Sequence, residues 1–202
     1  MSQTIPSATV GVPTPVSWTV TNDLAPVTIA PKGGPLGSAV AGRKTIANHE
    51  VQKFTVTIPA GATKFVAKIG NPSDPAADLD LTVYNAAGAI VAQQADGDSE
   101  EAVTINAPAA GTYTVEVDGY EIPSGSTQYD YLDVFYSADL GTLSVPATTT
   151  TLATGESTTV TGSITVAAVP EAGRQVSGEM RVLSEQGALL GTGEVLVGSV
   201  TP

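Results

Sequence analysis

The chain has 202 residues, of which 42% are hydrophobic, so it holds enough apolar material for a packed core, which argues against wholesale disorder. Twenty acidic residues against eight basic ones give a net charge of −12 without any basic cluster, which excludes nucleic acids and anionic membrane surfaces as partners. The lack of cysteine excludes disulfides and thiolate metal sites, and no apolar run approaches the roughly 20 residues that span a bilayer.

Alternation of apolar and polar residues with a period of two dominates the chain and predicts short strands. In "VSWTVTN", Val16, Trp18 and Val20 share one face. Residues 24–47 are rich in Gly and Pro and weakly patterned, so a loop or an extended connection is expected there. Two strands then follow in "EVQKFTVTI" and "TKFVAKIGN".

The middle of the chain predicts a strand, a turn and a strand in "ADLDLTVYNAAGAIVAQ", and the same pattern again in "EAVTINAPAAGTYTVEVDGY". In the first segment, Leu79, Leu81 and Val83 are expected to face the core, and Asp78, Asp80 and Tyr84 to point away from it. In the second, Tyr113, Val115 and Val117 are expected inside. The aromatic segment "YDYLDVFYS" is typical of a strand that packs in a sandwich core.

After Ser137 the chain becomes rich in threonine and loses its aromatic residues. The stretch "PATTTT" is either a flexible linker or a strand with a polar outer face, because threonine is a good strand former. Strands return in "GEMRVLSEQGALLGTGEVLVG", with a hairpin turn at "SEQGALL". About sixty residues is close to the lower size limit of a domain that folds alone, so a strand borrowed from the N-terminal segment or from a neighbour would complete this unit.

From about Val51 to Tyr136 the sequence resembles the pre-peptidase C-terminal domain family. The resemblance is carried by "ADLDLTVYNAAGAIV", by "GDSEEAVTINAPAAGTYTVEVDGY" and by "YDYLDVFYS". Members of this family are β-sandwich modules that follow the catalytic domains of secreted bacterial proteases. The flanking segments look more loosely like the Ig-like or fibronectin type III-like pieces of large subtilisin-like proteases, and the composition is similar to that of exported actinobacterial proteins.

The resemblance implies an all-β protein: an antiparallel, jelly-roll-like β-sandwich at residues 45–138, followed by a smaller Ig-like or fibronectin type III-like unit at 139–202. Residues 1–44 would be a strand and loop segment that belongs to a flanking Ig-like domain. The implied role is a non-catalytic accessory region of a secreted subtilisin-like serine protease, which stabilises the enzyme or binds a protein or polysaccharide substrate. Its partner would be the catalytic domain of the parent protease.

The first residues, "MSQTIPSATVGVP", lack the basic start and apolar block of a signal peptide. If the protein is exported, this chain is therefore expected to be part of a longer precursor. The alternative function is that of a free-standing extracellular adhesive or carbohydrate-binding β-sandwich. A third hypothesis is a structural spacer without a ligand.

Catalysis by this chain is not expected, because a Ser–His–Asp triad needs a histidine base with partners. The only histidine is His49, which lies in a polar segment just before a predicted strand, where a surface histidine is the ordinary expectation. Glu100 and Glu101 are adjacent, so on a strand they point to opposite faces and cannot flank one glycosidic bond.

Calcium is the one cofactor that the acidic segments suggest, since it binds six to eight oxygen ligands, several of them carboxylates. Asp74, Asp78 and Asp80 are the candidate ligands, with Asp78 and Asp80 about 7 Å apart on one strand face. No EF-hand spacing is present, so further oxygens would have to come from elsewhere in the fold. Turns and caps also favour Asp and Asn, and solvated turn acids remain the alternative.

Tyrosines offer a second kind of site, because exposed rings on one sheet face would form a platform for a protein or polysaccharide strand. Tyr84 and Tyr120 are the candidates for this surface, and Tyr84 shares its strand face with Asp78 and Asp80. For most tyrosines of this segment, burial with the hydroxyl at the rim is the alternative.

Overall fold

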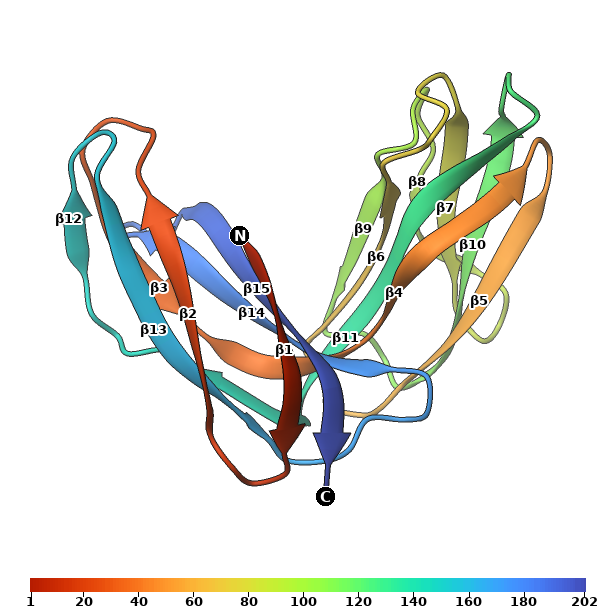
Figure 1. Cartoon of the computed structure of the whole chain (residues 1–202). Helices are drawn as coiled ribbons and strands as arrows, with labels where there is room; N and C mark the ends of the chain where they lie inside the picture. Colours follow the sequence, from red (N-terminus) through yellow and green to blue (C-terminus); the bar gives the residue numbers. More distant parts are fainter. The chain divides into compact units, whose positions relative to one another are not determined.

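The structure is a computed structural model that describes all residues from 1 to 202. It is entirely β, which confirms the predicted fold class; its sheets are antiparallel, and β1 pairs with β15 in the parallel direction. Figure 1 shows the strands in sequence colours. They are β1 (Ser2–Thr9), β2 (Thr14–Thr21), β3 (Val27–Lys32), β4 (Gly34–Ala47), β5 (Val51–Ile58), β6 (Lys64–Gly70), β7 (Asp78–Tyr84), β8 (Ile90–Gln94), β9 (Ala102–Asn106), β10 (Gly111–Glu121), β11 (Ser126–Ser144), β12 (Thr150–Leu152), β13 (Ser157–Val166), β14 (Gln175–Ser184) and β15 (Leu189–Thr201).

The chain divides into two compact units. Unit 2 is the continuous stretch 39–137, and unit 1 combines residues 1–38 with residues 138–202. The chain leaves unit 1 within β4 and returns to it within β11, so unit 2 is an insertion in the sequence of unit 1.

Unit 2 is a sandwich of two antiparallel sheets. One sheet has the order β5-β10-β7-β8, and in the other β6 pairs with β9 and β11. Two aromatic pairs join the sheets across the core: Phe54 lies 4.1 Å from Tyr131, and Phe65 lies 5.9 Å from Tyr113, measured between ring centroids. Such pairs add to the burial energy of the aromatic rings and fix how the two sheets face each other.

The alternation predicted for β7 and β10 is confirmed. Leu79, Leu81, Val83, Val115 and Val117 are completely buried, and β7 pairs with β10 over most of its length. Neighbours along each strand point the other way, because successive side chains of a strand alternate between its faces. This alternation places the polar side chains of both strands on the outer face of the sheet.

Unit 1 is built from the N-terminal and C-terminal parts of the chain together: β2 pairs with β13, β1 with β15, and β3 with β12 and β14. The C-terminal strands are thus completed by β1, β2, β3 and the start of β4 from the N-terminal segment. Trp18 of β2 is buried, and its indole N–H donates to the carbonyl of Glu194 on β15 at 3.3 Å. Around it lies an aliphatic core with Val160, Met180 and Val195.

The expectation of a loop or an extended connection at residues 24–47 was wrong, because most of this segment forms the paired strands β3 and β4. One of its glycines, Gly33, serves close packing. A Cβ atom on Gly33 would lie closer to the carbonyl oxygen of Leu143 than any real contact allows, so only glycine fits there. Ile29, Leu36 and Ile46 anchor the two strands in the protein interior.

Two further predictions for the C-terminal half concern the segments "PATTTT" and "SEQGALL". "PATTTT" is outside the strands at Pro146–Thr149 and enters the short strand β12 at Thr150. The hairpin turn in "SEQGALL" is confirmed between β14 and β15, where Gly187 adopts a φ of 82°. No helix with the length and hydrophobicity of a membrane span is present.

Candidate functional site

Two features of unit 2 carry chemistry: a cluster of acidic side chains around β7, and a polar groove on the outer face of the β5-β10-β7-β8 sheet. The acidic cluster follows from strand register. Asp80 lies directly opposite Asp118, and Asp78 lies opposite Glu121, so carboxylates face one another across the β7–β10 pair. Like charges placed opposite one another destabilise a sheet, so this arrangement has an energetic cost.

Burial and mutual repulsion act together on Asp78 and Asp80. Burial is the largest cause that raises the pKa of Asp78, and the nearby Glu121 raises it further. The pKa of Asp80 is raised by burial first and then by Asp78 and Asp118. The charge of Asp78 thus acts on Asp80, as their predicted position on a shared strand face implied.

Asp74, the third aspartate of the sequence-based prediction, has a different role. One of its oxygens accepts a hydrogen bond from the amide of Ala76, and the other accepts one from the amide of Ser124, both at 3.0 Å. The bonds from Ser124, followed by the bond from Ala76, hold the pKa of Asp74 below its ordinary value. Asp74 thus ties two turns together, as Asp commonly does in turns.

Glu101 belongs to the acidic cluster, although the sequence did not single it out as a site residue. It is 1% exposed, and its Oε1 accepts a hydrogen bond from the amide of Asp96 at 3.2 Å. Its Oε2 is buried without a hydrogen-bond partner, as is Oδ1 of Asp78. Burial raises the pKa of Glu101 from 4.5 to about 8, so this carboxyl group is protonated at neutral pH.

The acidic cluster contains oxygens of the type that calcium binds, since carboxylates are its usual protein ligands. Oδ1 of Asp78 and Oε2 of Glu101 are buried without a hydrogen-bond partner. As the side chains stand, no three of the acidic or histidine side chains converge closely enough to hold a metal ion. A bound cation would therefore require these side chains to turn toward a common point.

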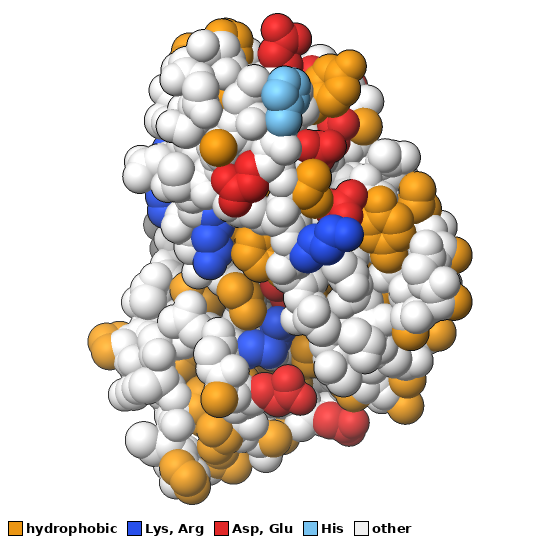
Figure 2. Space-filling model, turned by 90° about the vertical axis from the view of Figure 1, so that its right-hand side faces the viewer, with side chains coloured by type: hydrophobic (Ala, Val, Ile, Leu, Met, Phe, Trp, Pro, Cys, Tyr) orange, Lys and Arg blue, Asp and Glu red, His pale blue; other side chains and the backbone are white.

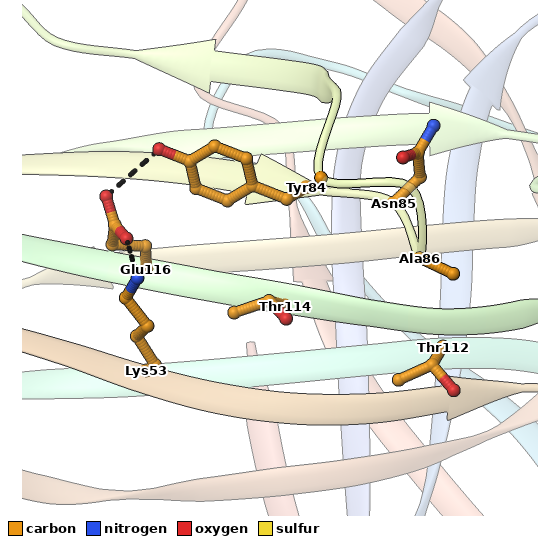
Figure 3. A pocket seen from close by; sticks show the side chains of 8 residues that line it. Lys53, Tyr84, Asn85, Ala86, Thr112, Thr114 and Glu116 are labelled. Carbon is orange, nitrogen blue, oxygen red and sulfur yellow. Dashed lines mark hydrogen bonds and ion pairs between the residues drawn. The ribbon is translucent and has the colours of Figure 1, made fainter.

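The second feature, which we call the Tyr84 groove, is a cavity of about 540 Å³ over β5, β10 and β7. Figure 3 shows the ring of Tyr84 along one side of it, with Glu116 and Lys53 at one end. The Tyr84 hydroxyl donates to Glu116 Oε1 at 3.1 Å, and Lys53 Nζ lies 2.9 Å from Glu116 Oε2. Thr112, Thr114 and Asn85 complete the polar lining.

The three charged or ionisable groups at the end of the groove stabilise one another. The hydrogen bond and the charge of Glu116 raise the pKa of Lys53, which stays a cation. Burial, followed by the hydrogen bond to Glu116, raises the pKa of the Tyr84 hydroxyl, which stays protonated and able to donate. The side chain of Glu116 is 18% exposed, and its two oxygens are held by Tyr84 and by Lys53.

The other predicted site residues lie elsewhere. Tyr120 is 57% exposed near the end of β10 and does not line the Tyr84 groove. Tyr129 and Tyr131 are buried in the core, as the alternative interpretation of the tyrosines expected. His49 is exposed at a turn with a φ of 62°, and its backbone amide donates to the carbonyl of Gly119.

On the face shown in Figure 2, acidic side chains are scattered and the few basic ones form no continuous patch.

The fold and the groove define a class: an antiparallel β-sandwich module with a polar surface groove. Within this class, residues 50–119 match the model of the bacterial pre-peptidase C-terminal domain, which confirms the predicted resemblance for that part of the chain. Pyrolysin of Pyrococcus furiosus is 31% identical over 158 residues, which cover 75% of this chain. The matched region is 11% of pyrolysin, so the chain spans about a tenth of the length of this relative.

Solved structures offer only weak similarities. A periplasmic inhibitor of g-type lysozyme from Aeromonas hydrophila is 17% identical with a TM-score of 0.37, and the match covers 48% of this chain and 86% of the inhibitor. A Bacillus licheniformis lipase in its propeptide form is 11% identical with a TM-score of 0.34, covering 80% of this chain and 40% of the lipase. Neither similarity is strong enough to inform function.

Proposed function

We propose that this chain is a non-catalytic accessory region of a secreted subtilisin-like serine protease, which stabilises the enzyme or binds its macromolecular substrate. The observation that carries the proposal is the match of residues 50–119 to the pre-peptidase C-terminal domain, on a segment that folds as a sandwich of its own. Pyrolysin, a subtilisin-like protease, supports the same context. The partner in this proposal is the catalytic domain of the parent protease.

The residues of the chain support a role without catalysis. Its single histidine lies at an exposed turn, and a serine nucleophile would need that base within hydrogen-bond reach and oriented by a third group. Incubation of the purified chain with casein, alongside labelling by a fluorophosphonate probe, tests this part of the proposal. We expect neither hydrolysis nor labelling, with subtilisin as the positive control; labelling of a serine in this chain would refute the proposal.

The Tyr84 groove favours a second candidate, a free-standing adhesive or carbohydrate-binding β-sandwich. The support is one aromatic ring, that of Tyr84, beside polar side chains that can orient a ligand by hydrogen bonds. The two candidate functions predict different genes. A reading frame that encodes a protease domain together with this region favours the accessory role. A reading frame without a protease domain favours the adhesive role.

For calcium, we propose that the carboxylates of Asp78 and Asp80 serve as ligands with the buried Glu101, and that Asp74 holds the adjoining turn. The support is the two buried carboxylate oxygens that have no hydrogen-bond partner, and the repulsion that a cation would relieve. Binding would require ionisation of Glu101, so calcium affinity should rise with pH.

A further inference from the structure

We propose that the Tyr84 groove binds a segment of a neutral polysaccharide. The inference deepens the proposed role in binding macromolecular substrate and rests on that role, but not on attachment to a protease. The first argument is size and position. A volume of about 540 Å³ lies within the roughly 300–1,000 Å³ of ordinary ligand sites. The groove lies on the outer face of the β5-β10-β7-β8 sheet, opposite the face that packs in the core of unit 2.

Charge is the second argument. The groove contains one cation and one anion, Lys53 and Glu116, and they are paired with each other at 2.9 Å. An anionic ligand would be repelled by the net charge of −12 of the chain, and a cationic ligand would have to compete with Lys53 for Glu116. A neutral ligand with hydroxyl groups has neither cost, and it can hydrogen-bond to the exposed side of the ion pair.

The third argument separates a sugar from a peptide. β10 pairs with β5 on one side and with β7 on the other, so its backbone N–H and C=O groups are used within the sheet. A peptide strand that binds by its main chain needs a free sheet edge, which this face does not offer. Instead the groove offers the hydroxyls of Thr112 and Thr114, which both donate and accept, as the hydroxyls of a sugar do.

The ring of Tyr84 is the fourth argument. Its hydroxyl is bound to Glu116, and Thr114 lies directly opposite Tyr84 in the β7–β10 register, so the ring is held near the Thr114 hydroxyl (Figure 3). A fixed aromatic ring presents an apolar face to the C–H side of a sugar while its polar tip stays hydrogen-bonded. Because the ring is already oriented, little side-chain entropy is lost on binding.

Affinity electrophoresis of the full chain tests the proposal, in native gels that contain hydroxyethyl cellulose, soluble starch or galactomannan. We expect retardation in at least one of these neutral gels, and at least a ten-fold weaker effect for Tyr84→Ala. Tyr84→Phe keeps the ring and should keep most of the retardation, and Thr114→Val should weaken it several-fold. Tyr120→Ala removes an exposed tyrosine outside the groove and should leave it unchanged.

Three results would overturn the proposal: no retardation in any of the neutral gels, retardation only in gels with carboxymethyl cellulose or gelatin, or equal loss in Tyr84→Ala and Tyr120→Ala. Thermal melting of each variant shows whether a loss comes from unfolding, and Tyr84→Phe and Thr114→Val give a second comparison if Tyr84→Ala is unfolded. Failure of glycan binding would leave the accessory role intact, because that role is tested separately by casein hydrolysis and by deletion from the protease.

Discussion

Replacement of Glu101 by Gln tests the account of the acidic cluster. The Glu101 carboxyl group is 1% exposed, and burial raises its pKa from 4.5 to about 8. Gln has nearly the same shape and keeps an oxygen that can accept the hydrogen bond from the Asp96 amide. It carries no charge at any pH, so the substitution removes the titration with little change in packing.

The sign and size of the effect follow from linkage. Between pH 4.5 and about pH 8, the unfolded chain loses the Glu101 proton while the folded chain keeps it, so the free energy of unfolding falls as pH rises. Each unit of difference in pKa corresponds to about 1.4 kcal/mol, which gives an upper limit of about 4–5 kcal/mol over the whole range. Glu101→Gln lacks this loss, so its stability relative to that of the wild type should increase by about 2–4 kcal/mol between pH 5 and pH 8, after allowance for local relaxation.

The measurement is urea unfolding of the wild type and Glu101→Gln at pH 5, 6, 7 and 8 with EDTA present. Asp78 and Asp80 also have raised pKa values, but they titrate in both proteins and largely cancel in the difference. Glu100→Gln is the comparison at the neighbouring position: the exposed Glu100 side chain accepts a hydrogen bond from the Asn71 amide, and its replacement should leave the pH-dependent effect of Glu101 in place. If the difference between Glu101→Gln and the wild type stays constant from pH 5 to pH 8, the reasoning about Glu101 is refuted.

Two further predictions concern calcium and the core of unit 1. Millimolar calcium should raise the melting temperature over that in EDTA, more at pH 8 than at pH 6, and Asp80→Asn should remove the increase; an unchanged melting temperature at both pH values would reject a structural calcium site. Gly193→Ala should destabilise unit 1 by about 1–3 kcal/mol, because the added Cβ would lie 2.8 Å from the Trp18 ring, whereas Gly191→Ala meets nothing within 4 Å and should be nearly neutral. Equal stability of the two alanine variants in urea unfolding would contradict this packing.

The regular alternation of β7 and β10 made their core faces predictable from the sequence, and Leu81 and Val115 are buried as expected. The strands at residues 24–47 were missed because Gly33 looks like a loop residue, and only the close approach of Leu143 shows why it is there. The site was harder to predict. Glu101 gave no signal, because an adjacent pair of glutamates does not reveal which one the fold buries.

The Tyr84 groove depends on strand register, which one sequence does not contain. Tyr84 was predicted to point away from the core, and its outward face is where the groove lies. Lys53 and Glu116 are 63 positions apart along the sequence, and only the pairing of β5 with β10 places them directly opposite each other. The same register brings Thr114 beside Tyr84.

Deletion of this region from its parent protease tests the central claim most directly. The quantities to compare, with and without the region, are kcat/KM on a short chromogenic peptide and the half-life of activity at elevated temperature or the retention on an insoluble substrate. A non-catalytic accessory region predicts an unchanged kcat/KM on the peptide, with a shorter half-life or weaker retention. A large loss of peptide hydrolysis by an enzyme that remains folded would contradict the account, because it would place part of this chain in the catalytic site.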